Sequence, residues 1–257
     1  MNHSIDDNAE GRTVNPVTRH YDGLLAAHYS WMQGATLADK AAEQAALLAA
    51  LGLGAEPAGI AVDLGCGPGY QSVALLTLGY ERVIAVDTSR DLLAELAAAA
   101  PGDRVEPVLS DLRDLPALVE RGSAGAIVCM GDTLTHLERH EDVLALYRDA
   151  YDALKPGGRL VLTFRDLSRE LAGLERFIPV RADDTRIMTC VLDYEPDGVV
   201  VTDLIHVRED AGWVLHKSSY RKLRLSPATQ VAALQRIGFV VDHDRAAGRM
   251  HAISARK

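Results

Sequence analysis

A glycine-rich turn after a short apolar segment constrains this chain more than any other stretch. Residues 60–69 read Ile-Ala-Val-Asp-Leu-Gly-Cys-Gly-Pro-Gly, so that an acid, Asp63, precedes Gly65, Gly67 and Gly69. Glycine tolerates positive φ and lets a ligand reach the main chain without a Cβ in the way. The helix expected to begin near Tyr70 offers free N–H groups at its start. The stretch therefore predicts a strand, a ligand-binding turn and a helix, in preference to an ordinary strand-to-helix turn.

The spacing of the glycines indicates which ligand the turn holds. A dinucleotide fingerprint reads Gly-x-Gly-x-x-Gly and cradles a pyrophosphate. In this chain the last two glycines are one residue closer together, and Asp63 stands in front of them. A carboxylate is a poor neighbour for phosphate and suits a cationic ligand such as a sulfonium amino acid. A nicotinamide-dependent oxidoreductase is the rival interpretation, and the spacing disfavours it.

Composition limits the class of protein. The chain has 257 residues, 48% of them hydrophobic and 25% charged, which fits one elaborated globular domain. The net charge of −9 disfavours a nucleic-acid partner, because phosphate binding needs a basic face. Cys66, Cys129 and Cys190 are too widely spaced for a zinc site or a disulfide framework, so we expect no metal. We expect no membrane segment, since no apolar run approaches about 18 residues, and a cytoplasmic location.

Alternating strand and helix patterns predict a parallel sheet covered by helices on both faces. The expected strands are residues 60–63, 82–87, 105–109, 126–130 and 159–164, followed by a final pair at 239–242 and 250–255. The expected helices of the same region are residues 71–78, 89–100, 114–120, 141–154 and 227–237. The fold class is therefore α/β.

We expect a single domain over residues 1–257, built from five successive parts. These are a flexible tail (1–15), an N-terminal helical cap (16–56), a core (57–166), a lid with an antiparallel insert (167–225), and a C-terminal helix and strand pair (226–257). Two helices, residues 17–33 and 36–51, form the cap. Three β segments, residues 186–194, 199–207 and 213–225, are joined by turn sequences and form the insert. The loop 166–184 before them is the candidate lid.

Polar residues follow the predicted strands, and ligands in doubly wound sheets bind at that edge. Asp87 ends the second strand, where a carboxylate can accept bonds from two vicinal hydroxyls or can cap the next helix. Asp111 follows the third strand, where it either contacts the ligand or is only an exposed acid of a loop. Met130 to Asp132 follow the fourth strand, and Arg165 follows the fifth. These residues extend the site that the glycine turn begins.

The glycine turn resembles motif I of class I S-adenosylmethionine (SAM)-dependent methyltransferases. The resemblance covers about residues 60–164, and the turn Leu154-Lys155-Pro156-Gly157-Gly158 is its other specific piece. It implies a Rossmann-like fold with a mostly parallel seven-stranded sheet that closes with an antiparallel edge hairpin. It also implies that SAM is the cofactor and S-adenosylhomocysteine the product. The cofactor-binding residues implied are Asp63, Gly65, Cys66, Gly67, Gly69, Asp87, Thr88, Asp111, Leu112, Met130 and Gly131.

A finer resemblance is to the glycine N-methyltransferase-like enzymes. Their segment Gly-Asn-Ser-x-x-His-Leu after strand four is similar to Gly131-Asp132-Thr133-Leu134-Thr135-His136-Leu137 of this chain. They place an arginine beyond strand five to grip the substrate's carboxylate, where this chain has Arg165, and Tyr220 falls near a family tyrosine. This chain departs at Asp132, where the family has an amide. An acid there repels a carboxylate and attracts an amine, which argues against glycine itself as the acceptor.

Methyl transfer from a sulfonium is an in-line displacement, so the main tasks are to align donor and acceptor and to exclude water. His136 and Asp132 are the candidate catalytic residues, since either side chain can take the acceptor's proton. The candidate substrate-binding residues are Arg165, Tyr29, Trp31 and Tyr220. Simpler roles stay open: His136 packs or caps a helix, Arg165 pairs with a nearby acid, and the aromatic residues pack in the core.

The sequence therefore predicts a SAM-dependent methyltransferase with a small-molecule partner, an amine or an amino-acid-like acceptor. O-methylation of a carboxylate or hydroxyl metabolite stays open, as does a non-catalytic module that binds SAM or its demethylated product. A macromolecular substrate is less favoured, because the chain is acidic and the insert is expected to close the site. A homo-oligomer is compatible with the sequence.

Overall fold

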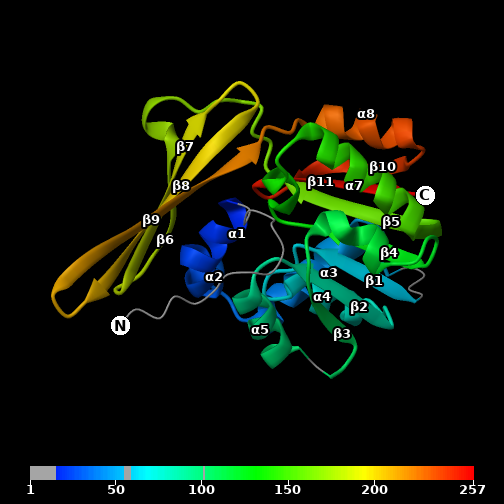
Figure 1. Cartoon of the computed structure of the whole chain (residues 1–257), viewed down its shortest axis with the longest axis horizontal. Helices are drawn as coiled ribbons and strands as arrows, with labels where there is room; N and C mark the ends of the chain where they lie inside the picture. The colour runs from blue at the N-terminus through cyan, green and yellow to red at the C-terminus, as the bar shows by residue number, and fades with distance from the viewer. Residues whose placement is uncertain (1–15, 55–58, 101) are drawn as a thin grey trace, which may run out of the picture.

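The computed structural model describes residues 16–54, 59–100 and 102–257. A seven-stranded sheet forms the core, a four-stranded sheet stands beside it, and the N-terminal helices lie between the two (Figure 1). The flexible tail expected at residues 1–15 lies outside the described residues. Within the described residues no helix is long and apolar enough to cross a bilayer.

The core sheet has the order β10-β11-β5-β4-β1-β2-β3. Its neighbours pair in parallel, except that β11 is antiparallel to both β5 and β10. The prediction of a mostly parallel seven-stranded sheet with an antiparallel edge hairpin is therefore confirmed. The strands are β1 (Ile60–Leu64), β2 (Arg82–Asp87), β3 (Val105–Leu109), β4 (Ala124–Cys129), β5 (Leu154–Phe164), β10 (Val240–Ala247) and β11 (Met250–Arg256).

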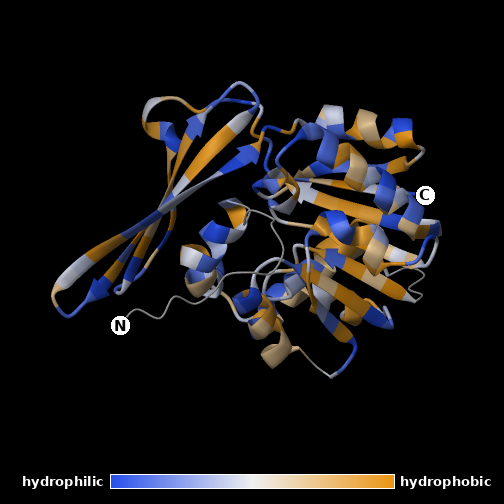
Figure 2. Cartoon of the chain, in the orientation of Figure 1, coloured by the Kyte–Doolittle hydropathy of each residue, from blue (hydrophilic) through white to orange (hydrophobic). Residues whose placement is uncertain are grey.

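Helices cover both faces of the core sheet. Alternate residues of β1 point to opposite sides, so that Val62 and Leu64 join one apolar cluster and Ala61 joins another. The helices on the Ala61 side are α3 (Leu37–Ala50), α4 (Tyr70–Thr77) and α5 (Arg90–Ala99). Those on the other side are α6 (Leu115–Leu118), α7 (His140–Ala153) and α8 (Pro227–Ile237). Figure 2 shows the resulting apolar colour along the strands of the core sheet.

Short 3₁₀ turns complete the connections between these elements. They are η2 (Leu112–Asp114), η3 (Thr133–His136) and η4 (Gly173–Arg176). Two of them follow the carboxyl ends of β3 and β4, and the third precedes the second sheet. The turns η2 and η3 therefore carry side chains at the edge of the sheet where ligands bind in such folds.

The insert is an antiparallel sheet of four strands, one more than the sequence predicts. Its strands are β6 (Phe177–Ala182), β7 (Arg186–Tyr194), β8 (Gly198–Glu209) and β9 (Gly212–Leu223), in that order. The extra strand, β6, lies within the loop 166–184 that was expected to be a lid. The sequence does not predict this strand, because Pro179 interrupts the pattern typical of a strand. Within a sheet, proline is tolerated only on an edge strand or at a bulge. The structure has both features: β6 is an edge strand, and its register shifts between Pro179 and Arg181.

The N-terminal cap departs from the single helix expected over residues 17–33. It consists of α1 (Pro16–His20), a π-helical turn η1 (Tyr21–Leu25) and α2 (Ala26–Gln33). Leu24 and Leu25 pack against Met188 and Ile205 of the insert. The cap therefore covers part of the inner face of the insert sheet. A π turn changes the helical phase locally and often occurs at functional sites.

The start of β5 differs from the sequence pattern because glycines continue the strand. β5 begins at Leu154, ahead of the expected residue 159. The Gly157 N–H donates to the carbonyl of Lys257 at 3.0 Å, which extends the sheet through the expected turn. A Cβ on Gly158 would lie 2.9 Å from the carbonyl oxygen of Lys155. The close approach of backbone at this position explains the glycine, which the sequence presents as turn chemistry.

Candidate functional site

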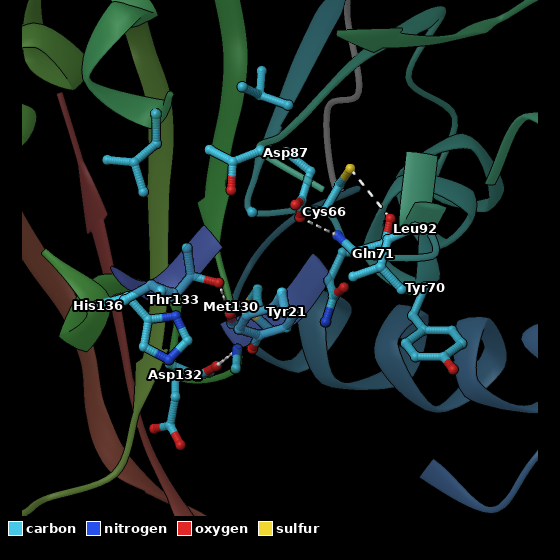
Figure 3. A pocket seen from close by; sticks show the side chains of 18 of the residues that line it. Tyr21, Cys66, Tyr70, Gln71, Asp87, Leu92, Met130, Asp132, Thr133 and His136 are labelled. Carbon is cyan, nitrogen blue, oxygen red and sulfur yellow. Dashed lines mark hydrogen bonds between the residues drawn. The ribbon is translucent and has the colours of Figure 1, made fainter. Parts of the chain in front are cut away.

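A cavity of about 310 Å³ opens at the carboxyl ends of the parallel strands, beneath the N-terminal cap. The strand order reverses between β1 and β4, and that point is where ligands bind in open α/β sheets. The cavity is lined by the glycine turn after β1, Asp87 at the end of β2, Asp111 after β3 and the segment after β4. Figure 3 shows Tyr21, Asp132 and His136 grouped on one side and Cys66, Asp87 and Leu92 on the other. We call this cavity the cofactor pocket.

The structure brings most of the sequence-predicted residues into the cofactor pocket. Those that line it are Tyr29, Gly65, Cys66, Gly67, Asp87, Thr88, Asp111, Leu112, Met130, Gly131, Asp132 and His136. Asp63 and Gly69 lie outside its lining, and Arg165 and Tyr220 line a second cavity instead. Trp31 lines neither cavity, and its indole N–H donates to Asp183 at 2.5 Å.

Two glycines leave room for a ligand against the main chain. Gly67 has φ +51°, and the nearest atom to a Cβ built there is Cε1 of Tyr29 at 3.8 Å. Gly131 has φ +69°, and a Cβ there would meet nothing within 4 Å. Gly65 differs, since its Cβ would overlap Thr133 at 2.3 Å. Gly67 and Gly131 therefore form a cradle that a side chain would fill.

Asp87 holds the glycine turn and also faces the pocket. Its carboxylate accepts the Gly67 N–H at 2.8 Å and the Ser89 N–H at 2.9 Å. Burial raises its pKa above the usual value, while these backbone N–H groups lower it. The Thr88 N–H also lowers the pKa of Asp87, so three backbone N–H groups face this carboxylate. A carboxylate has about four lone-pair sites, so acceptor capacity remains for a ligand hydroxyl.

Asp63 supports the turn from beneath and does not line the pocket. It is 1% exposed and accepts the Ser72 hydroxyl at 2.6 Å. Burial raises its pKa to about 7. Its second oxygen, Oδ1, has no hydrogen-bond partner among the described residues. Asp63 therefore ties β1 to the first turns of α4, which fixes the direction in which the glycine turn leaves the sheet.

Asp111 lies at the far end of the pocket and is engaged by Arg113. Its two oxygens accept from Nε of Arg113 at 2.9 Å and from Nη2 at 2.7 Å. Its Oδ1 also accepts the Arg113 N–H, which caps the turn η2. The paired guanidinium lines the pocket as well. This end of the pocket therefore presents a fixed polar pair beside the apolar side chain of Leu112.

The opposite wall carries a buried ionic cluster that the sequence indicates only in part. Asp132 Oδ2 lies 2.8 Å from Nζ of Lys222 and 3.2 Å from Nη1 of Arg165, and Asp132 Oδ1 accepts the Arg165 N–H at 2.9 Å. Burial favours the neutral acid, but the two cations outweigh it and hold the pKa of Asp132 well below its usual range. Asp132 is therefore ionised, and the cluster of one anion and two cations carries a net positive charge.

His136 stands beside this cluster with an unpartnered nitrogen. Its ring centre is 5.8 Å from that of Tyr21 and 5.4 Å from that of Tyr220. Nε2 is shielded from solvent and has no partner among the described residues. Burial, followed by the charge of Lys222, lowers the pKa of His136 to about 3. The imidazole is therefore neutral at pH 7 and can accept a hydrogen bond from a group in the pocket.

Sequence analysis missed several residues that line the two cavities, although a sequence pattern could have indicated the positions of some of them. Lys222 lies two residues after Tyr220 in an expected β segment, so the two side chains share a face. Lys222 lines the second cavity, whereas Lys40 and Gln44 of α3 line the cofactor pocket and lie four residues apart on one helix face. No sequence pattern places Tyr21 at the pocket, because its position depends on the π turn η1. The described residues contain no cluster of three metal-ligating side chains.

The N-terminal cap forms part of the wall of the cofactor pocket and is fastened on both sides. Thr18 Oγ1 donates to Thr88 Oγ1 of the core at 3.1 Å. On the insert side, His20 Nε2 lies 3.0 Å from Asp203 Oδ2, and both side chains are fully buried. His20 also stacks on Tyr220, with ring centres 4.3 Å apart. The cap therefore joins the core to the insert beside the pocket.

The chain matches known proteins mainly over its core. Residues 61–158 match the family model of a methyltransferase domain. A ubiquinone biosynthesis O-methyltransferase from Xanthomonas axonopodis pv. citri (strain 306) is 37% identical over 111 residues, which cover 42% of this chain and 44% of that protein. A glycine/sarcosine N-methyltransferase from Halorhodospira halochloris is 33% identical over 107 residues, covering 41% of this chain and 39% of that protein. The chain thus matches about two fifths of these relatives.

Solved structures share the fold over nearly the whole chain. The CcbJ methyltransferase from Streptomyces caelestis superposes with a TM-score of 0.74, covering 92% of this chain and 97% of that chain at 24% identity. The likeness therefore includes the insert and the cap as well as the core. At this identity the likeness establishes the architecture alone.

Proposed function

On the premise that residues 61–158 belong to the methyltransferase domain family, we propose that this chain transfers a methyl group from SAM to a small-molecule acceptor. When bound, SAM supplies an electrophilic methyl group on a sulfonium. Gly67 and Gly131 receive it along the main chain, Asp87 accepts the ribose hydroxyls, and Asp111 with Leu112 borders the base. The cradle of Gly67 and Gly131 beside Asp87 is the observation that carries this assignment.

The acceptor atom is proposed to sit between Tyr21, His136 and Tyr220. The unpartnered Nε2 of His136 supports this position, because it can accept an N–H or O–H of the acceptor and aim its lone pair. A pKa of about 3 makes His136 too weak a base to ionise the acceptor beforehand. Its role is therefore to accept the hydrogen bond that orients the acceptor. An ammonium product is a weaker acid than a protonated His136, so it loses its proton to solvent after release.

Asp132 is proposed as a positioning residue and not as the base. Lys222, the Arg165 side chain and the Arg165 N–H already engage its carboxylate, and its pKa is lowered. The fixed carboxylate in turn orients Lys222 near His136. Arg165 is proposed to contact the acceptor with the part of its guanidinium that Asp132 does not engage, since its side chain is 48% exposed.

The leading acceptor is an amine, which must be neutral to attack. The net positive charge of the Asp132 cluster supports this chemistry, because it disfavours the ammonium form and so favours the free amine. The same charge gives a second candidate, O-methylation, since it stabilises a hydroxyl acceptor as it loses its proton. A glycine/sarcosine N-methyltransferase and a ubiquinone biosynthesis O-methyltransferase are both among the relatives.

The test measures cofactor choice first and turnover second. Calorimetric titration should give SAM binding and no NAD binding, and tight NAD binding without SAM binding would overturn the proposal. Release of S-adenosylhomocysteine is then followed with a panel of amines, phenols and carboxylates. His136→Gln is expected to lower kcat with SAM affinity unchanged. SAM binding with no turnover across the panel would instead support a non-catalytic SAM-binding module.

A further inference from the structure

A second cavity of about 450 Å³ lies behind the wall that His136 and Asp132 form. It shares Met250 with the cofactor pocket. Tyr220 lines this cavity and meets the His136 ring edge-on, with the two ring centres 5.4 Å apart. Lys222 and Arg165 also line it, and both pair with Asp132. The dividing layer is therefore one side chain thick at Met250 and two side chains thick where Tyr220 meets His136. We call this second cavity the insert chamber.

The floor of the insert chamber is the inner face of the insert sheet. The N-terminal cap covers one end of that face, where Leu24 and Leu25 meet Met188 and Ile205. The other end faces the chamber with Ile178, Leu192, Tyr194 and Val201, which belong to a separate apolar cluster. A volume of this size with apolar walls suits a drug-sized molecule.

The remaining walls of the insert chamber carry positive charge. Arg165, Arg169, Lys222 and Arg249 line it, against a single acid, Asp166. Asp166 is engaged by Ser168, whose N–H and hydroxyl both donate to it. Arg165 and Lys222 share Asp132, whereas Arg169 and Arg249 have no ion pair among the described residues. A chain of net charge −9 thus concentrates cations around one apolar cavity.

We propose that the insert chamber binds the methyl acceptor, and that this acceptor has an apolar body and an oxyanion such as a carboxylate. The apolar body lies on Leu192 and Val201, and the oxyanion meets Arg169 and Arg249. The accepting atom then passes Tyr220 to reach His136. This inference rests on the proposed function, because it assumes that the cofactor pocket holds SAM. It adds a substrate class that Arg165 alone does not define.

The test uses two probes of the same shape in the presence of saturating S-adenosylhomocysteine. The probes are 2-naphthoate and its uncharged counterpart 2-naphthylmethanol, and binding is measured by calorimetry. We expect 2-naphthoate to bind at least about tenfold more tightly, since a hydrogen bond to a charged partner contributes roughly 1.5–3 kcal/mol. The double variant Arg169→Gln/Arg249→Gln should lose this preference. The control variant Arg208→Gln, an exposed arginine at the end of β8 outside the chamber, should keep it.

A cavity-filling variant tests the apolar floor separately. Ile178→Trp, on the edge strand β6, should abolish binding of both probes while the affinity for S-adenosylhomocysteine stays as in the unchanged protein, which shows that the fold is intact. Equal affinity for the two probes, a preference that survives in the double arginine variant, or no binding of 2-naphthoate up to about 1 mM overturns the inference. Each of these results leaves the proposed function standing if S-adenosylhomocysteine binds. Failure of the unchanged protein to bind it would overturn the proposed function itself.

Discussion

The ammonium of Lys222 lies 2.8 Å from the carboxylate of Asp132, and the two side chains are only 7% and 9% exposed. The pair joins strand β9 of the insert to the turn after β4 of the core. It is one of the contacts between the insert and the candidate active site, together with that of Tyr220 and His136. Arg165 completes the cluster at 3.2 Å, from the segment that follows β5.

Lys222→Met should destabilise the protein by roughly 3 kcal/mol, because removing one partner of a buried pair leaves the other charge poorly compensated. Lys217→Met on the same strand is the matched control, since Lys217 is exposed, and should change stability by less than about 0.5 kcal/mol. Urea unfolding measures both. Similar small losses in the two variants would mean that Lys222 does not stabilise Asp132.

Gly131→Ala should weaken SAM binding by about tenfold or more, because a methyl group would project into the cofactor pocket. Gly122→Ala is the control, since Gly122 has φ +73° against +69° at Gly131, and neither site has an atom within 4 Å of a new Cβ. Both variants should lose about 1–2 kcal/mol of stability through backbone strain. If the SAM affinity measured by calorimetry falls equally in the two variants, Gly131 has no special contact with the cofactor.

Asp87→Ala should weaken SAM binding by more than about 1 kcal/mol, because the ribose hydroxyls lose their acceptor and the Gly67 N–H loses its partner. Asp91→Ala, an exposed acid in the first turn of α5, should leave the affinity unchanged. Isothermal titration with SAM measures the difference. An unchanged dissociation constant in Asp87→Ala would remove this residue from the site.

Protonation of His136 should make the protein less stable in acid. Its pKa in the folded chain is about 3, below the ordinary 6.5, so the unfolded chain binds a proton between these pH values that the folded chain does not. The stabilisation is complete above about pH 6.5 and is lost as the pH falls toward 3, at up to about 1.4 kcal/mol per pH unit. The stability difference between the unchanged protein and His136→Gln should follow this course in chemical denaturation. A difference independent of pH would contradict a buried neutral imidazole.

Arg165→Lys should raise KM for an anionic acceptor while SAM affinity stays constant, because lysine keeps the charge beside Asp132 but loses the planar fork that binds a carboxylate. Steady-state kinetics with the acceptor found in the panel measures this split between KM and SAM binding. If KM does not change, Arg165 serves only to hold Asp132.

The sequence alone determined the part of the site that is proposed to bind the methyl donor. Glycine spacing, the acid at the end of β2 and the alternation of apolar strands with helices are local patterns, and they predict a parallel sheet with its binding edge at Gly67, Asp87 and Gly131. The antiparallel insert was also predicted from its turn sequences. Its edge strand β6 was not, because Pro179 breaks the pattern that marks a strand.

Only the tertiary structure decided the part of the site that is proposed to bind the methyl acceptor. Lys222, Asp132 and Arg165 come from three separate segments, and only the packing of the insert on the core shows that they meet. That meeting converts Asp132 from an expected proton acceptor into an ionised partner of two cations, and burial next to Lys222 keeps His136 neutral. Tyr21 reaches His136 through a π turn, η1, that the helical period of the sequence does not reveal. Charges and burial act through space, so residue order could not supply these roles.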